Sequence, residues 1–315
     1  MSNETRKGRF QRKSRPNRQS TAENGERPRK SAGMRAPVSV SAPRSPKSKE
    51  NSGGQRDRKN RGPRRGSGSS SGGGREGGAG WIWGTHAVRA ALANSRRTIH
   101  DIIATDTALA RLDLPESAPA PKIVQPAVLD RDFGHGHQGV AIKAAPLEWP
   151  DISDIAAEPG ENGIILVLDQ ITDPHNVGAM LRLCSAFGVR ALVMQTRKAP
   201  PLSGAAAKVA VGCVETIPVC LVTNIANILQ DLQKQNWLVT GLAGETDLSL
   251  SKALANGGNH VIVMGAEGPG LRTRVRGTCD QLAKIPMLSS DVAGEAESLN
   301  VATAAGIALY EARRG

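Results

Sequence analysis

Hydrophobic residues divide the chain into a polar first quarter and a patterned remainder. The run Ile-Ile-Leu-Val-Leu at 164–168 is continuously apolar, which is typical of a parallel strand buried on both faces. Similar runs and helical spacing predict strands at 191–194, 217–222, 238–242 and 261–264, and helices at 177–187, 205–211, 224–235 and 298–313. Because strands and helices alternate, we expect an α/β domain with a largely parallel sheet and helices on both faces.

A smaller pattern precedes this domain. A helix is predicted after Gly84, a polar turn is predicted at 133–139, and strand fragments are predicted at 99–104, 122–124 and 140–143. The sequence therefore predicts a small α/β domain at 81–146, a connection rich in proline and acidic residues at 147–162, and the larger domain at 163–315.

The first quarter has a different composition. Residues 1–80 hold 21 basic and 6 acidic residues, a net charge of +15, whereas 81–315 hold 20 basic and 23 acidic residues. The segment has Phe10 as its only aromatic residue and ends in a run of glycine and serine, so we expect a disordered tail. Its charge favours salt-dependent contact with RNA phosphates. A solubilising leader or a targeting presequence is the alternative, although scattered acidic residues are unusual in a presequence.

Other features exclude several classes of protein. No stretch reaches the roughly 18 apolar residues of a membrane span and no signal-peptide core follows the start, so we expect a soluble, cytoplasmic protein. The four cysteines form no CxxC pair, which is typical of free thiols in a reducing compartment. Beside His135 and His137 only Asp130 and Asp132 stand at ligand spacing, so turn formation or RNA contact is favoured over metal binding.

Three segments carry candidate chemistry at predicted strand ends or helix starts. The first runs from Asp173 through Asn176 to Arg182; helix capping by Asn176 and a surface role for Arg182 are the alternatives. The second is the glycine-rich loop 265–270, which matches neither a P-loop nor a dinucleotide fingerprint. Its Glu267 would repel phosphate, so this loop favours a cationic or donor-rich ligand. The third segment is Ser-Leu-Asn at 298–300.

Together these segments closely resemble the three ordered motifs of the SpoU (TrmH) family of RNA ribose 2′-O-methyltransferases. The resemblance covers about 81–315 and rests on DQITDPHNVGA at 169–179 followed by Arg182, VMGAEG at 263–268, IPM at 285–287 and SLNVA at 298–302. GTHAV at 84–88 and HQGVA at 137–141 resemble the small substrate-binding domain of the family's RlmB branch, which methylates a guanosine of 23S rRNA.

The resemblance implies a SPOUT fold, in which a parallel sheet ends in a trefoil knot, and a homodimer that uses no metal. It implies S-adenosylmethionine as the cofactor, in a pocket without lysines and with Glu267 near the sulfonium. Carried over to this sequence, the cofactor-binding residues are Gly265, Ala266, Gly268, Ile285, Met287 and Leu299. The apolar members of this set would sandwich adenine.

The implied catalytic residues are Asn176, Arg182, Glu267, Ser298 and Asn300. Family accounts give the arginine a base-like role, but a guanidinium is effectively never deprotonated, so bidentate binding of the flanking phosphate suits Arg182 better. Ser298 and Asn300 would orient the ribose hydroxyl, and Asn176 with Glu267 would hold Arg182. The eleven residues 288–298 exceed the common family spacing beside the cofactor pocket.

Two other functions remain open at this stage. A tRNA ribose 2′-O-methyltransferase is one, although that branch usually lacks the small domain. A non-catalytic RNA-binding or ribosome-assembly protein is the other, but it leaves the three polar segments without a role.

Overall fold

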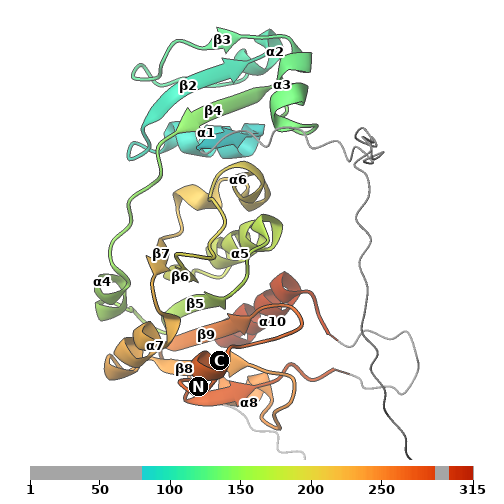
Figure 1. Cartoon of the computed structure of the whole chain (residues 1–315). Coiled ribbons are helices and arrows are strands. Elements are labelled where there is room, and N and C mark those ends of the chain that lie inside the picture. The colour runs from blue at the N-terminus through green and yellow to red at the C-terminus, as the bar shows by residue number, and fades with distance from the viewer. Residues whose placement is uncertain (1–79, 288–297, 315) are drawn as a thin grey trace, which may run out of the picture. The chain divides into compact units, whose positions relative to one another are not determined.

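The computed structural model describes residues 80–287 and 298–314 (Figure 1). The predicted tail, apart from its last residue, and the long segment before Ser298 lie outside the described residues. Within the described part, no helix has both the length and the apolar character that a membrane span requires. All four cysteines are free thiols, as predicted.

The first part of the described chain builds a four-stranded sheet in the order β1-β4-β2-β3. β4 is antiparallel to both β1 and β2, and β3 is parallel to β2. The strands are β1 (Trp81–Trp83), β2 (Ile99–Ala104), β3 (Lys122–Ile123) and β4 (Val140–Ala144), and the helices are α1 (Thr85–Ala93), α2 (Asp106–Leu109) and α3 (Pro126–Phe133).

The remainder of the described chain confirms the predicted parallel sheet. Six strands lie in the order β10-β8-β9-β5-β6-β7, and every neighbouring pair is parallel. They are β5 (Ile164–Asp169), β6 (Ala191–Gln195), β7 (Val219–Val222), β8 (Leu238–Leu242), β9 (His260–Gly265) and β10 (Gln281–Ala283). The helices are α4 (Ile152–Ala157), α5 (Pro174–Ala186), α6 (Gly204–Ala210), α7 (Ile225–Lys234), α8 (Leu250–Ala253), α9 (Thr273–Arg276) and α10 (Val301–Arg314), with a 3₁₀ turn, η1, at Cys213–Glu215.

β5 is buried along its whole length because helices cover both faces of the sheet. Its alternate residues Ile164, Leu166 and Leu168 belong to a core that also contains α5 and α10. Ile165 and Val167 belong to a second core that contains α4 and α7. The continuous apolar run at 164–168 therefore forms a parallel strand buried on both faces, as its pattern predicted.

The chain order along the sheet changes direction at β5. The strands that follow β5 directly, β6 and β7, lie on one side, and β9, β8 and β10 lie on the other. Asp169 at the end of β5 is in register with Gly265 at the end of β9. Ligands of open parallel sheets bind outside the carboxyl ends of strands at such a switch point.

Several element boundaries differ from the prediction. The connection 147–162 contains α4, whose Ile152 and Ala156 are buried. α5 begins three residues before the predicted start, and α10 begins three residues after it. β1 and β10 have three residues each, too few to show a period in the sequence.

A buried ion pair joins residues from the two sheet regions. Arg97 and Glu215 approach to 2.7 Å, and their side chains are only 5% and 4% exposed. Asn94 also donates to the Glu215 carboxylate, at 2.9 Å, and Arg97 donates to the carbonyl of Ala145. These bonds satisfy a carboxylate that would otherwise be buried without a partner.

His260, at the start of β9, allows a test of how closely the parallel sheet is buried. It is 1% exposed, neither ring nitrogen makes a hydrogen bond of good geometry, and burial lowers its pKa below the ordinary 6.5. Below pH 6.5 the unfolded chain binds a proton on this histidine more readily than the native chain. The free energy of unfolding should therefore fall by up to about 1.4 kcal/mol per pH unit below that point, with no contribution above it.

His260→Leu should flatten this decline in urea unfolding measured from pH 7.5 to pH 5. His100→Leu, at an exposed position of β2, is the matched control and should keep the wild-type pH dependence. A His260→Leu protein as acid-sensitive as the wild type would contradict the assignment.

Candidate active site

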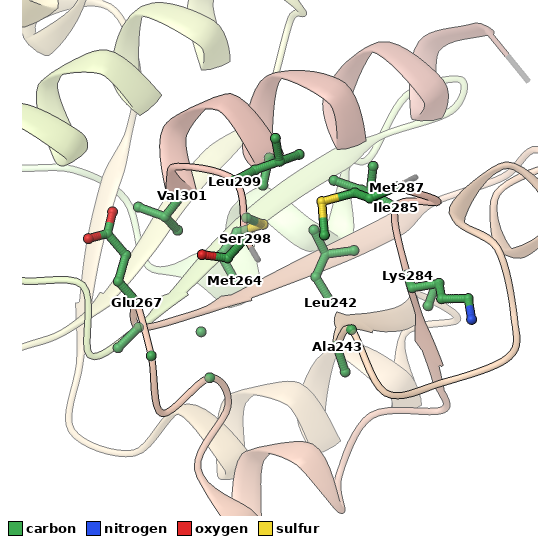
Figure 2. Close-up of a pocket in the computed structure, with 17 residues that line it drawn as sticks. Leu242, Ala243, Met264, Glu267, Lys284, Ile285, Met287, Ser298, Leu299 and Val301 are labelled. Atoms are coloured by element: carbon green, nitrogen blue, oxygen red, sulfur yellow. The ribbon is translucent and has the colours of Figure 1, made fainter. Parts of the chain in front are cut away.

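A pocket of about 230 Å³ lies at the carboxyl ends of β8 and β9 (Figure 2). It contains all six residues predicted to bind a cofactor, together with Glu267 and Ser298. Its lining is Leu242, Ala243, Gly244, Met264, Gly265, Ala266, Glu267, Gly268, Gly270, Ala283, Lys284, Ile285, Met287, Ser298, Leu299, Val301 and Ala304. Most of these side chains are small or apolar, so backbone groups supply much of the polar character of the pocket.

The loop after β9 folds back on itself. Ala266 and Gly270 exchange backbone hydrogen bonds of 3.2 and 3.0 Å. A Cβ atom on Gly265 would lie 2.5 Å from the backbone nitrogen of Leu271, a distance that no side chain tolerates. Gly265 is therefore required by the close approach of backbone to backbone, and Gly268 by its φ of +83°.

A buried carboxylate fixes the far end of this loop. Asp169 is fully buried at the end of β5 and accepts hydrogen bonds from the backbone N–H and the Nε of Arg272, at 2.9 and 2.7 Å. Because Gly265 pairs with Asp169 in the sheet and Arg272 binds its side chain, both ends of the loop are held by one residue.

Asn176 is not the helix cap that one interpretation of the sequence allowed. Asp173 caps α5 by accepting from the backbone N–H of His175, with Pro174 in the first turn. The same bond lowers the pKa of the Asp173 carboxyl. The amide of Asn176 is thus available, and its Nδ2 donates to Oε1 of Glu267 at 3.3 Å.

Asn300 has two roles. Its Oδ1 caps α10 by accepting from the N–H groups of Ala302 and Thr303, at 2.9 and 3.3 Å. Its Nδ2 donates to Oδ1 of Asn176 at 3.2 Å and to Oε1 of Glu267 at 3.3 Å. One hydrogen-bonded network therefore joins three predicted residues that come from segments far apart in the sequence.

Arg182 does not join this network. It is exposed, has no hydrogen bond or ion pair with the described residues, and lies in a separate hollow beside Ala302 and Thr303 of α10. The six positions from Asn176 to Arg182 turn a helix by about 240°, which places the two side chains on different faces. The expectation that Asn176 and Glu267 would hold Arg182 does not agree with this arrangement.

The pocket includes residues that the sequence did not single out. Leu242 ends β8, and Ala243 and Gly244 follow it. Their signal was available, because a glycine two residues after the end of a predicted strand marks a candidate site. Lys284 also lines the pocket, which corrects the expectation of a pocket without lysines. Its position could not be inferred because the three-residue β10 before it was not predicted.

Figure 2 shows how the labelled side chains lie. Leu242, Ile285 and Met287 gather toward one end of the lining, and Glu267 lies at the other. The side chain of Lys284 extends away from the other labelled residues. The view therefore separates an apolar end of the pocket from an end with a carboxylate.

Both histidines of the pair in the small sheet region are hydrogen-bonded to one carboxylate. Nδ1 of His135 and Nε2 of His137 contact Oδ1 of Asp130 at 2.9 and 3.1 Å, and this pairing, chiefly with His137, lowers the pKa of Asp130. Nδ1 of His137 accepts from the N–H of Gly139. Residues 80–287 and 298–314 contain no group of three or more His, Cys, Asp or Glu arranged to hold a metal ion.

Comparison with known proteins identifies the family. A sequence profile of the SpoU rRNA methylase family matches residues 163–310, and one for the substrate-binding domain of RNA 2′-O ribose methyltransferases matches 81–150. A 23S rRNA (guanosine-2′-O-)-methyltransferase RlmB from Vibrio vulnificus is 43% identical over 188 residues, 59% of this chain and 73% of that protein. The chain belongs to the SpoU family.

Other SpoU relatives extend the match. An RlmB from Xylella fastidiosa is 37% identical over 244 residues, which cover 74% of this chain and 96% of that protein. Among solved structures, AviRb from Streptomyces viridochromogenes has a TM-score of 0.62 at 20% identity, over 74% of this chain and 88% of that one. An AdoMet-bound rRNA methyltransferase from Sinorhizobium meliloti has a TM-score of 0.62 at 23% identity, over 74% and 86%. These structures share the fold of the SpoU chain described above.

The double role of Asn300 can be tested by two substitutions. Asn300→Ser keeps an oxygen that can cap α10, whereas Asn300→Ala removes it. We expect Asn300→Ala to lower the free energy of unfolding by about 1 kcal/mol and Asn300→Ser to stay within a few tenths of the wild type, as measured by urea unfolding. Equal losses in both variants would show that the cap is not what Asn300 contributes to stability.

Proposed function

We propose that this protein transfers a methyl group from S-adenosylmethionine to the ribose 2′-hydroxyl of a guanosine in 23S rRNA. The observation that carries the proposal is the network of Asn176, Glu267 and Asn300, which joins the three family motifs beside the pocket. The names of the RlmB relatives, at 37% and 43% identity, support the reaction and the substrate.

The pocket suits S-adenosylmethionine in its chemistry. Leu242, Ile285, Met287 and Leu299 offer apolar surface to adenine, and the backbone of the loop 265–270 offers hydrogen-bonding groups at close range. The carboxylate of Glu267 suits a positively charged sulfur, and the single lysine extends away from the other labelled residues. When bound, S-adenosylmethionine supplies an electrophilic methyl group.

The chain's own residues would position the RNA. Ser298 lines the pocket, and Asn300 is held by its bonds to α10 and Asn176, so both can orient the ribose hydroxyl toward the methyl group. Arg182 is exposed and unpaired within the described residues, which leaves its guanidinium free to bind the flanking phosphate bidentately.

The remaining parts have proposed roles in substrate binding and assembly. Residues 81–146 would bind RNA, and the basic tail 1–80 would add salt-dependent attraction to its phosphates. We also propose that the protein works as a homodimer, and that the C-terminal segment of the parallel-sheet domain is threaded through a loop as a trefoil knot.

Mapping of 2′-O-methyl groups tests the function. In cells that lack the protein, one guanosine of 23S rRNA should lose its methyl group, and purified protein with labelled S-adenosylmethionine should restore it in vitro. Loss of a tRNA site alone would instead indicate a tRNA methyltransferase. RNA binding without methyl transfer to any rRNA or tRNA would indicate a non-catalytic protein.

Arg182→Lys tests the proposed role of the arginine. Lysine keeps the charge but loses the planar fork, so we expect kcat to fall by about ten-fold or more at saturating S-adenosylmethionine. Arg190→Lys, at an exposed position directly before β6, is a control that should keep wild-type turnover. Near-normal turnover of Arg182→Lys would exclude bidentate phosphate binding.

A further inference from the structure

A second cavity lies within the small sheet region. It has a volume of about 450 Å³ and shares no lining residue with the pocket at β8 and β9. Its lining comes from α1, from α2 and the residues around it, from the first residue of α3, and from the loop before β4 with the first residue of that strand. The volume lies within the range of about 300 to 1,000 Å³ in which proteins bind small ligands.

Two arginines give the cavity an uncompensated positive charge. Arg89 and Arg111 are both exposed, and Nη2 of Arg89 donates to the backbone carbonyl of Arg111. Within the described residues neither guanidinium pairs with a carboxylate, and no acidic residue lines the cavity. Guanidinium groups without acidic partners favour phosphate, which they bind bidentately.

Hydroxyl and amide groups line the same cavity as the two arginines. Thr105 and Thr107 approach each other to 3.3 Å through their hydroxyls. Oε1 of Gln138 accepts from the N–H of Thr85 at 2.7 Å, while its Nε2 has no partner in the described part of the chain. Gln138 holds this position with a left-handed backbone, φ +55°, directly before Gly139. Donors and acceptors of this kind suit the edges of a base or a ribose hydroxyl.

The rest of the lining is apolar. Ala108, Leu112, Pro126 and Val140 contribute to the cavity wall. A lone phosphate would leave this surface unused, because an inorganic anion offers only charged oxygens. A nucleotide offers a phosphate, a polar sugar and a flat base, and these match the three kinds of surface present.

We propose that this cavity binds one unpaired nucleotide of the RNA substrate, with the phosphate held by Arg89 and Arg111. The base and ribose lie against the threonines and Gln138. Sequence-specific RNA recognition commonly targets unpaired nucleotides, whose base edges are free for hydrogen bonding. The inference rests on the proposed function for its choice of RNA as the ligand, and it adds a recognition site outside the methyl-transfer pocket.

The test uses the full-length protein and an RNA stem-loop whose loop carries 4-thiouridine or 6-thioguanosine for photocrosslinking. Arg89→Gln/Arg111→Gln removes both guanidiniums. The matched control is Lys122→Gln/Arg131→Gln, which removes the same charge from exposed side chains of the same region that do not line the cavity. Because the tail is present in every variant, differences between them isolate the cavity.

We expect the first double variant to raise Kd for the stem-loop about ten-fold at physiological salt. The slope of log Kd against log salt should fall by about 0.7 for each phosphate that the variant no longer binds. Crosslinks in the wild type should map to peptides containing 105–112 or 137–140 and should disappear in this variant. The control pair should change none of these readouts, and a fully duplexed RNA should bind both variants alike.

Unchanged affinity and unchanged crosslinks in the first double variant would overturn the proposal, as would an equal loss in the control pair. Saturable crosslinking of free 6-thio-GMP without any crosslink to the RNA loop would overturn the assignment to RNA. If the double variant unfolds, Arg111→Gln alone provides the test, because the Arg111 side chain makes no hydrogen bond in the described part of the chain.

The proposed function and the proposed nucleotide site can be refuted independently. Methyl transfer by the wild type tests the function, whereas RNA affinity and the position of the crosslinks test whether the cavity binds a nucleotide. A wild type that methylates rRNA and a double variant with unchanged KM for RNA would leave the function intact and remove this site.

Discussion

The buried carboxylate of Asp169 is the interaction on which the candidate site depends. It ends the central strand of the parallel sheet, and its partner Arg272 follows the glycine loop after β9. A fully buried charge is strongly destabilising without a counter-ion, so the pair fixes where the loop must leave and where it must return. The backbone contact between Gly265 and Gly270 then sets how tightly the loop curls. The position of Glu267 follows from these two constraints.

Amide side chains connect this loop to the rest of the site. Asn176 and Asn300 each offer both a donor and an acceptor, so they can bond to each other and to the carboxylate of Glu267 simultaneously. An aspartate would offer only acceptors when ionised, and the single hydroxyl hydrogen of a serine could not be donated to both partners of the Asn300 amide. Asn300 also caps α10, so the helix that closes the pocket and the network that joins the motifs share one residue.

The sequence predicted the strands with apolar runs and the long helices well, but missed several short elements. The continuous apolar run at 164–168 predicted β5, and the helical spacing at 177–187 predicted most of α5, because a segment of that length expresses a helical period clearly. β10, with three residues, and α4, with six, carry too little periodicity, and packing against neighbouring elements stabilises them. The start of α5 was predictable in principle, because Asp followed by Pro at 173 and 174 is a typical helix start.

The sequence by itself determined the α/β class, the three motifs, the family and the six predicted cofactor-binding residues, all of which line the pocket. These follow from local patterns and short motifs, which can be recognised without knowing where the residues lie in the fold. Only the tertiary structure decided which side chains meet. Asn176, Glu267 and Asn300 come together because β5 and β9 are neighbours in the sheet, whereas Arg182, only six residues after Asn176, faces elsewhere because of the turn of the helix. Lys284 entered the pocket for the same reason, since strand order is a property of long-range packing and no local pattern specifies it.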